Sequence, residues 1–201
     1  MFTRTTRGLA ALALLAALPA CSSGEPEDGP GEEELITQVT LTFTPAGGGA
    51  AQTIQITSDA DGNNPVPSPA RLTLRPGVTY SGAVQFRDTI NDEDITREIR
   101  DEAEEHSVLY TLTPSTAGTV TVTDTETDYT TDDENGRDLN VGLTFDLAVA
   151  SGASGDGNML GILYHFDPEE DAVKTSNTAT SDEIDIEFRV PLRFQAEAAR
   201  R

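Results

Sequence analysis

The stretch "EIDIEFRVPLRF", residues 183–194, alternates apolar residues with charged ones over most of its length. Successive side chains of a β-strand point to opposite faces of a sheet, so the pattern separates an apolar face from a charged one. Asp185 and Glu187 then belong to the outward face, where charges are expected. The stretch predicts a half-buried antiparallel strand, whose inward side chains are Ile184, Ile186, Phe188, Val190, Leu192 and Phe194.

The same period of two recurs along most of the chain. Clusters of Gly, Pro, Asp and Asn separate the alternating stretches, as turns separate strands. We therefore predict an all-β fold: a single antiparallel β-sandwich of about nine strands, built from residues 35–195. The other eight predicted strands lie within residues 35–44, 52–58, 71–77, 78–88, 106–113, 118–125, 138–150 and 158–166.

One segment, "NDEDITREIRDEAEEH" (residues 91–106), breaks this pattern. Its apolar residues Ile95, Ile99 and Ala103 are spaced four apart, which predicts one short amphipathic helix that connects two strands. His106 ends the segment, and His165 is the only other histidine. Neither histidine has the local ligand spacing of a zinc site, so contact of His106 with the helix C-terminal dipole is favoured over metal ligation.

The N-terminus has the layout of a secretory signal peptide over residues 1–20. Arg4 and Arg7 precede an apolar run, "LAALALLAAL" (residues 9–18), which is too short to span a bilayer as a helix. The following residues "LPAC" resemble the lipobox of bacterial lipoproteins, and Cys21 is the only cysteine. The resemblance implies that Cys21 is the lipidated first residue of the mature protein.

The residues after Cys21 predict how the domain is anchored. Residues 21–34 contain Gly, Pro, Ser and acids, a composition that predicts an acidic flexible tether, and residues 196–201 predict a disordered tail. Ser22 resembles an outer-membrane sorting signal, and the acids after it resemble a surface-export signal. The expected location is the outer membrane, lipid-anchored, on the periplasmic side or at the cell surface.

Longer stretches resemble a family of small exported lipoproteins of Gram-negative bacteria. They are "EEELITQVTLTFTPAGGG" (residues 32–49), "EDITREIRDEAEEHSVLYTL" (93–112), "NVGLTFDL" (140–147) and "DEIDIEF" (182–188). Some members carry a label of the type 1 periplasmic-binding fold, which the strand pattern does not fit because that fold alternates strands and helices. The resemblance implies location and fold, without a defined activity.

The charge is strongly acidic, at −22, and Lys174 is the only lysine. Binding of nucleic acid depends on Lys and Arg that neutralise phosphates, so nucleic-acid binding is excluded. An excess of acids serves solubility in general. The preference for Arg over Lys favours adaptation to salt.

Two loops place Asp, Asn and Gly at alternate positions, as calcium-binding loops do. They are "SDADGNN" (residues 58–64) and "DDENGRD" (residues 132–138), which makes Asp59, Asp61, Asp132 and Asp138 candidate calcium ligands. Both loops lack the complete pattern and its closing glutamate, and the same residues also form ordinary turns. The sequence requires no cofactor, and calcium is the one candidate.

No catalytic motif is present, so we predict that the protein is not an enzyme. The leading hypothesis is a lipid-anchored envelope lipoprotein with a structural or binding role, with the membrane and another envelope protein as its partners. The alternative is a calcium-stabilised surface module for adhesion or carbohydrate contact. A hydrolase assembled from scattered acids is the third hypothesis, supported only by their number.

The lipid anchor can be tested directly. Radiolabelled palmitate should label the wild-type protein in cells and should not label Cys21→Ala, because the thiol is the acylation site that the lipobox implies. Equal labelling of the two proteins would contradict the anchor.

Overall fold

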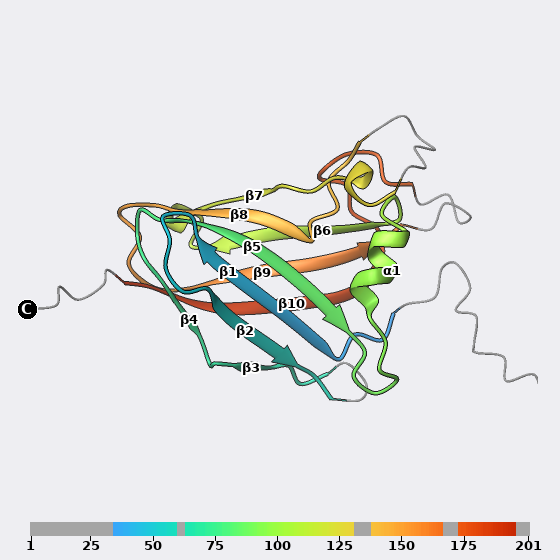
Figure 1. The fold of residues 1–201 in the computed structure, drawn as a ribbon, viewed down its shortest axis with the longest axis horizontal. Coiled ribbons are helices and arrows are strands. Elements are labelled where there is room, and N and C mark those ends of the chain that lie inside the picture. Colours follow the sequence, from blue (N-terminus) through green and yellow to red (C-terminus); the bar gives the residue numbers. More distant parts are fainter. Residues whose placement is uncertain (1–33, 60–62, 131–137, 167–172, 196–201) are drawn as a thin grey trace, which may run out of the picture.

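The computed structural model describes residues 34–59, 63–130, 138–166 and 173–195. Within these residues, ten strands form two sheets that pack face to face, and one α-helix lies at one end of the sandwich (Figure 1). The predicted all-β sandwich with one short helix is therefore confirmed. The predicted signal peptide, Cys21, the tail and almost all of the tether lie outside the described residues. No described helix is long and apolar enough to cross a membrane.

The first sheet has six antiparallel strands in the order β3-β2-β1-β5-β8-β7. Two of the neighbouring pairs, β1 with β2 and β2 with β3, are consecutive in the chain with short connections (residues 46–51 and 58–65), whose sequences contain Gly or Pro. The strands are β1 (Gln38–Pro45), β2 (Gln52–Thr57), β3 (Val66–Ser68), β5 (Thr79–Arg87), β7 (Gly118–Val122) and β8 (Thr144–Val149).

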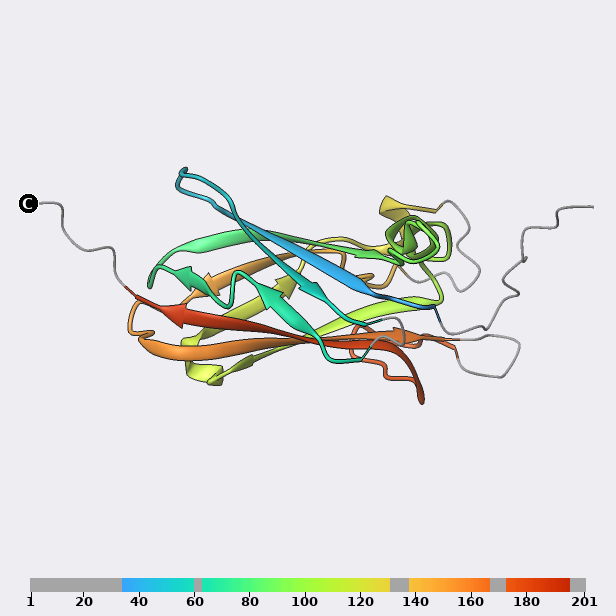
Figure 2. The same ribbon diagram turned by 90° about the horizontal axis from the view of Figure 1, so that it is seen from below.

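The second sheet has four strands in the order β4-β10-β9-β6. They are β4 (Leu72–Leu74), β6 (His106–Thr113), β9 (Gly155–His165) and β10 (Glu183–Phe194). β9 pairs antiparallel along most of its length with both β6 and β10, whereas β4 pairs in parallel with only the last three residues of β10. Figure 2 shows the two sheets as separate layers.

Helix α1 (Ile95–Asp101) carries the chain from the first sheet to the second. Its apolar residues Ile95 and Ile99 are buried, and so is Ala103 just beyond its end, as the four-residue spacing predicts. The helix begins at the end of β5, where the Thr96 hydroxyl accepts a hydrogen bond from the Phe86 amide and donates one to the Phe86 carbonyl. Helix α1 lies at the end of the sandwich where β9 ends and β10 begins (Figure 1).

Aromatic rings from both sheets meet in the centre of the core. Tyr110 contacts the Phe145 ring of the other sheet at 4.7 Å between centroids and the Phe188 ring of its own sheet at 6.4 Å. Phe86 packs edge-on against Phe188, and Phe43 packs edge-on against Phe145. Offset and edge-to-face pairs of this kind add to the stabilisation that burial of the rings provides.

The predicted alternation of β10 is wrong at its beginning. The ladder with β9 shifts between Ile184 and Ile186, because Asp185 is an extra residue, a β-bulge, in β10. Ile184 is consequently 43% exposed, whereas the Asp185 side chain, predicted to face outward, is fully buried. A bulge re-aims the side chains around it, and period two alone cannot reveal one. From Ile186 onward the predicted inward residues face the core, and Glu187 lies on the exposed face.

Gly161 and Phe188, which face each other in the β9–β10 ladder, provide a test of this packing. A methyl group at position 161 would overlap the Phe188 ring, so Gly161→Ala should lower the free energy of unfolding by about 1–3 kcal/mol. Gly152→Ala is the control, because nothing lies within 4 Å of its new Cβ. Urea denaturation should show a change within about 0.5 kcal/mol for the control. Equal stabilities of the two variants would contradict the packing.

Candidate metal centre

Four side chains converge under α1 at the end of the sandwich: Glu34, His106, His165 and Asp185. Glu34 precedes β1 in the first sheet, and the other three lie at the ends of β6, β9 and β10 in the second sheet. One ligand atom from each side chain can be chosen so that the four atoms lie within 4.8 Å of one another. They form a cluster of two imidazoles and two carboxylates.

The sheet itself brings the two histidines together. His106 is the first residue of β6 and His165 the last residue of β9, and the two are direct partners in the antiparallel ladder. Direct partners carry their side chains on the same face, so both rings point inward and stack at 4.6 Å between centroids. Both side chains are almost completely buried, at 0% and 3% exposure.

The end of α1 orients the first ring. His106 Nδ1 lies 3.1 Å from the carbonyl oxygen of Glu102, the C-terminal capping residue of the helix. A carbonyl only accepts, so Nδ1 carries the proton and Nε2 is left as a lone-pair donor. The predicted contact of His106 with the helix end is therefore present. This contact is compatible with metal ligation, because metal-binding histidines ordinarily donate their second N–H to a carbonyl or carboxylate.

Carboxylate oxygens lie near the remaining ring nitrogens of the two histidines. His106 Nε2 lies 3.7 Å from Glu34 Oε2 and 3.8 Å from Asp185 Oδ2. The other oxygen of Asp185 lies 3.8 Å from His165 Nδ1, and Glu105 Oε2 lies 3.8 Å from His165 Nε2. These separations exceed hydrogen-bond lengths but leave room between the atoms for one small cation.

Several of these atoms are buried without a hydrogen bond among the described residues. They include Glu34 Oε2, His106 Nε2 and both ring nitrogens of His165. A buried polar atom without a partner costs about 1–3 kcal/mol, and more when it is charged. Such atoms are rare in folded proteins, and an ion that they coordinate would account for several of them together.

The environment shifts the pKa values of the two imidazoles in opposite directions. Burial lowers the pKa of His106, but the nearby carboxylates of Glu34 and Asp185 outweigh burial, so the pKa is raised above its ordinary value. Burial and then the proximity of His106 lower the pKa of His165. Of the two rings, His106 therefore more readily takes a second proton, at Nε2, and a metal that binds Nε2 competes with that proton.

The donor set fits a divalent transition metal such as zinc. Zn²⁺ binds His nitrogen and carboxylate oxygen at about 2.0–2.2 Å in tetrahedral geometry, in which ligand atoms are about 3.3 Å apart. The two ligand atoms that lie farthest apart must therefore move about 1.5 Å closer to each other. Small rotations of both side chains can provide this movement. Calcium takes six to eight oxygen ligands, and imidazole is not among them. Two carboxylates would also balance the charge of a divalent ion.

The only lysine of the chain, Lys174, contacts the backbone of this site. Lys174 Nζ forms an ion pair with Glu126 Oε1 at 2.8 Å and donates hydrogen bonds to the carbonyls of Ala103 and His106. Burial lowers the pKa of the ammonium group, and Glu126 opposes that effect. The ion pair is almost fully buried, so it holds the backbone of His106 in place at the start of β6.

Removal of the Lys174 ammonium group should destabilise the fold. Lys174→Met leaves the Glu126 carboxylate buried without its charge partner, and we expect a loss of about 3–5 kcal/mol in the free energy of unfolding. Lys174→Met/Glu126→Gln should recover most of the loss, because no uncompensated charge remains. Arg189→Met, at an exposed pair with Glu187, is the control and should cost less than about 1 kcal/mol. Urea denaturation that shows similar losses for Lys174→Met and Arg189→Met would contradict the assignment.

Each of the two predicted calcium loops has one of its two candidate ligands in the described part of the chain. Asp59 accepts hydrogen bonds from the Asn63 amide and the Asn64 side chain within its own turn. Asp138 accepts hydrogen bonds from the Thr127 amide and hydroxyl. The other two predicted ligands, Asp61 and Asp132, lie outside the described residues. Calcium binding at these loops stays a prediction.

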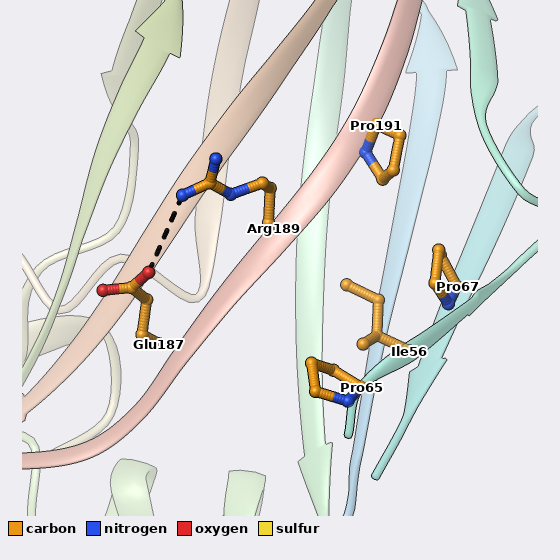
Figure 3. A pocket seen from close by; sticks show the side chains of 6 residues that line it. All are labelled: Ile56, Pro65, Pro67, Glu187, Arg189 and Pro191. Carbon is orange, nitrogen blue, oxygen red and sulfur yellow. Dashed lines mark ion pairs between the residues drawn. The ribbon is translucent and has the colours of Figure 1, made fainter. Parts of the chain in front are cut away.

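A hollow of about 340 Å³ lies on the side of the sandwich, between β10 and the β2–β3 hairpin (Figure 3). Its charged residues Glu187 and Arg189 form an exposed ion pair at 3.9 Å, so no buried polar group faces a ligand there. The prolines lack an amide hydrogen, and prolines at open strand edges prevent pairing with another chain. The hollow is lined by Ile56, Pro65, Pro67, Glu187, Arg189 and Pro191.

Sequence reasoning missed the four-residue cluster because its members are far apart in the chain and share no spacing motif. The available signal was that His106 begins one predicted strand and His165 lies near the end of another, so antiparallel pairing would join them. Nothing in the sequence indicates Glu34, and period two placed Asp185 on the wrong face.

No protein family and no curated protein matches the chain. Among solved structures, the chain resembles a nucleoside hydrolase-related hypothetical protein from Saccharophagus degradans that is associated with carbohydrate metabolism. The two are 14% identical with a TM-score of 0.33, over 70% of this chain. The chain spans 25% of the length of that protein, and a similarity this low carries no conclusion about function.

Proposed function

We propose that this protein is a lipid-anchored envelope lipoprotein with a non-enzymatic structural or binding role, and that its sandwich domain binds a divalent transition-metal ion of the zinc class. The observation that carries the metal assignment is the convergence of two buried imidazoles and two carboxylates, in which Glu34 Oε2, His106 Nε2 and the His165 ring nitrogens are buried without a hydrogen bond among the described residues. The anchor rests on the lipobox resemblance at Cys21.

The geometry favours a structural or binding role over catalysis. A structural zinc site is closed by four protein ligands, whereas a catalytic site keeps one position open for water or substrate. Here four protein ligands are available, and the most exposed of their side chains, that of Glu34, is only 14% exposed. An ion held there would join the two sheets. Glu34 lies just before β1 of the first sheet, and the other three ligands belong to the second sheet.

Titration with Zn²⁺ and Co²⁺ tests this assignment. The full-length protein in detergent should bind one equivalent of either ion, and Co²⁺ should give the visible absorption of a tetrahedral site. Asp185→Asn should weaken binding by about 100-fold or more, because loss of an outer-shell partner alone costs about 10–100-fold. Glu187→Gln, two residues along the same strand but outward, should bind as the wild type does.

Thermal melting separates this site from the calcium alternative. A zinc concentration of about 100 times Kd should stabilise the fold by about 2.7 kcal/mol, which corresponds to a rise of about 5–10 °C in Tm. Calcium at the same concentration should leave Tm unchanged. A rise with calcium that persists in Asp185→Asn would favour the loops of Asp59 and Asp138, and absence of stoichiometric Zn²⁺ and Co²⁺ binding would overturn the metal centre.

A further inference from the structure

We infer that the metal ion fastens the N-terminal segment to the end of the sandwich, so that metal occupancy controls where the chain leaves the domain. The inference rests on the proposed function, and it gives that site a regulatory role. Glu34 is the ligand on which it depends, because the other three ligands are fixed in the second sheet whether or not an ion is present.

The segment around Glu34 is held only in part by the sandwich itself. From Thr37 onward, hydrogen bonds fix the chain: the Thr37 amide donates to the Arg87 carbonyl, and the Thr37 hydroxyl accepts from the Thr89 amide. Ile36 is buried in the core, whereas Leu35 is 37% exposed. Glu34 lies three residues before Thr37, so its own position depends on what its side chain meets.

The cluster holds the Glu34 side chain less firmly without a metal ion, because a protonated His106 supplies one positive charge to two carboxylates, whereas a divalent ion supplies two. Glu34 Oε2 is buried without a hydrogen bond and lies 3.7 Å from His106 Nε2, next to a second carboxylate, that of Asp185. Two carboxylates that share a buried site repel each other, and water solvates a carboxylate better than an apolar interior does. A divalent ion reverses this balance, because it coordinates both carboxylates and removes the repulsion.

Metal binding would also affect the connection between the domain and its predicted lipid anchor. The chain before Glu34 leads back to Cys21, the predicted lipid attachment. With the ion bound, this chain would depart from the α1 end of the sandwich, beside the metal centre. Without it, only the burial of Ile36 and the hydrogen bonds of Thr37 would hold the chain there, so residues 34–36 would open more often. Metal would thus set how the domain is held relative to its anchor.

Amide hydrogen exchange of the full-length protein in detergent tests the inference. Zn²⁺ at saturation should slow exchange of the amides of residues 34–36 by about tenfold or more in the wild type. In Glu34→Gln, which keeps the other three ligands, saturating Zn²⁺ should protect the ends of β6, β9 and β10 but leave residues 34–36 as in the metal-free protein. Glu187→Gln is the matched control and should behave as the wild type does.

The outcomes separate the two proposals. Stoichiometric zinc binding with unchanged exchange at residues 34–36 would overturn this inference and leave the metal centre standing. Equal protection of these residues in Glu34→Gln would also overturn it. Absence of zinc binding in the wild type would overturn both. Glu34→Ala, with circular dichroism to show that the fold is intact, guards against weak coordination by the glutamine side chain and should give the same result as Glu34→Gln.

Discussion

The register of β6 and β10 against β9 is the constraint on which both the core and the candidate metal centre depend. Side chains of paired strands alternate together between the two faces, so a slip of one residue would turn every inward side chain outward. The register that places Val108 and Tyr110 in the core also directs His106 inward at the end of the same strand. The ligands are thus positioned by the same apolar contacts that stabilise the sandwich, since strand ends cannot shift independently of their centres.

The bulge at Asp185 interrupts this regular pattern, and it places a carboxylate in the candidate metal centre. Regular alternation would have sent the aspartate to solvent and Ile184 to the interior. The extra residue buries the aspartate beside both histidines and exposes the isoleucine. Exposure of an isoleucine and burial of a carboxylate both cost free energy, and local departures of this kind are common next to functional sites. A bound cation would offset the second cost.

Charge is distributed unevenly between the surface and the interior. The chain carries 35 acidic residues, and its single lysine is buried in an ion pair next to the candidate metal centre. An acidic surface favours approach of cations over anions. Lys174 pairs with Glu126 and also donates hydrogen bonds to the carbonyls of Ala103 and His106, so the segment before β10 is tied to the start of β6.

The sequence by itself determined the sandwich, the helix over Ile95, Ile99 and Ala103, and most inward residues, because period two and period 3.6 are local signals of which side of an element is buried. It also predicted the contact of His106 with the helix end, a local matter as well. Only the tertiary structure brought together the candidate metal centre. Its four residues come from four separate segments, and strand pairing that joins distant residues leaves no mark on local spacing. The face on which Asp185 lies depends on a bulge, which is set by the fit of β10 against β9 and by no pattern within β10 alone.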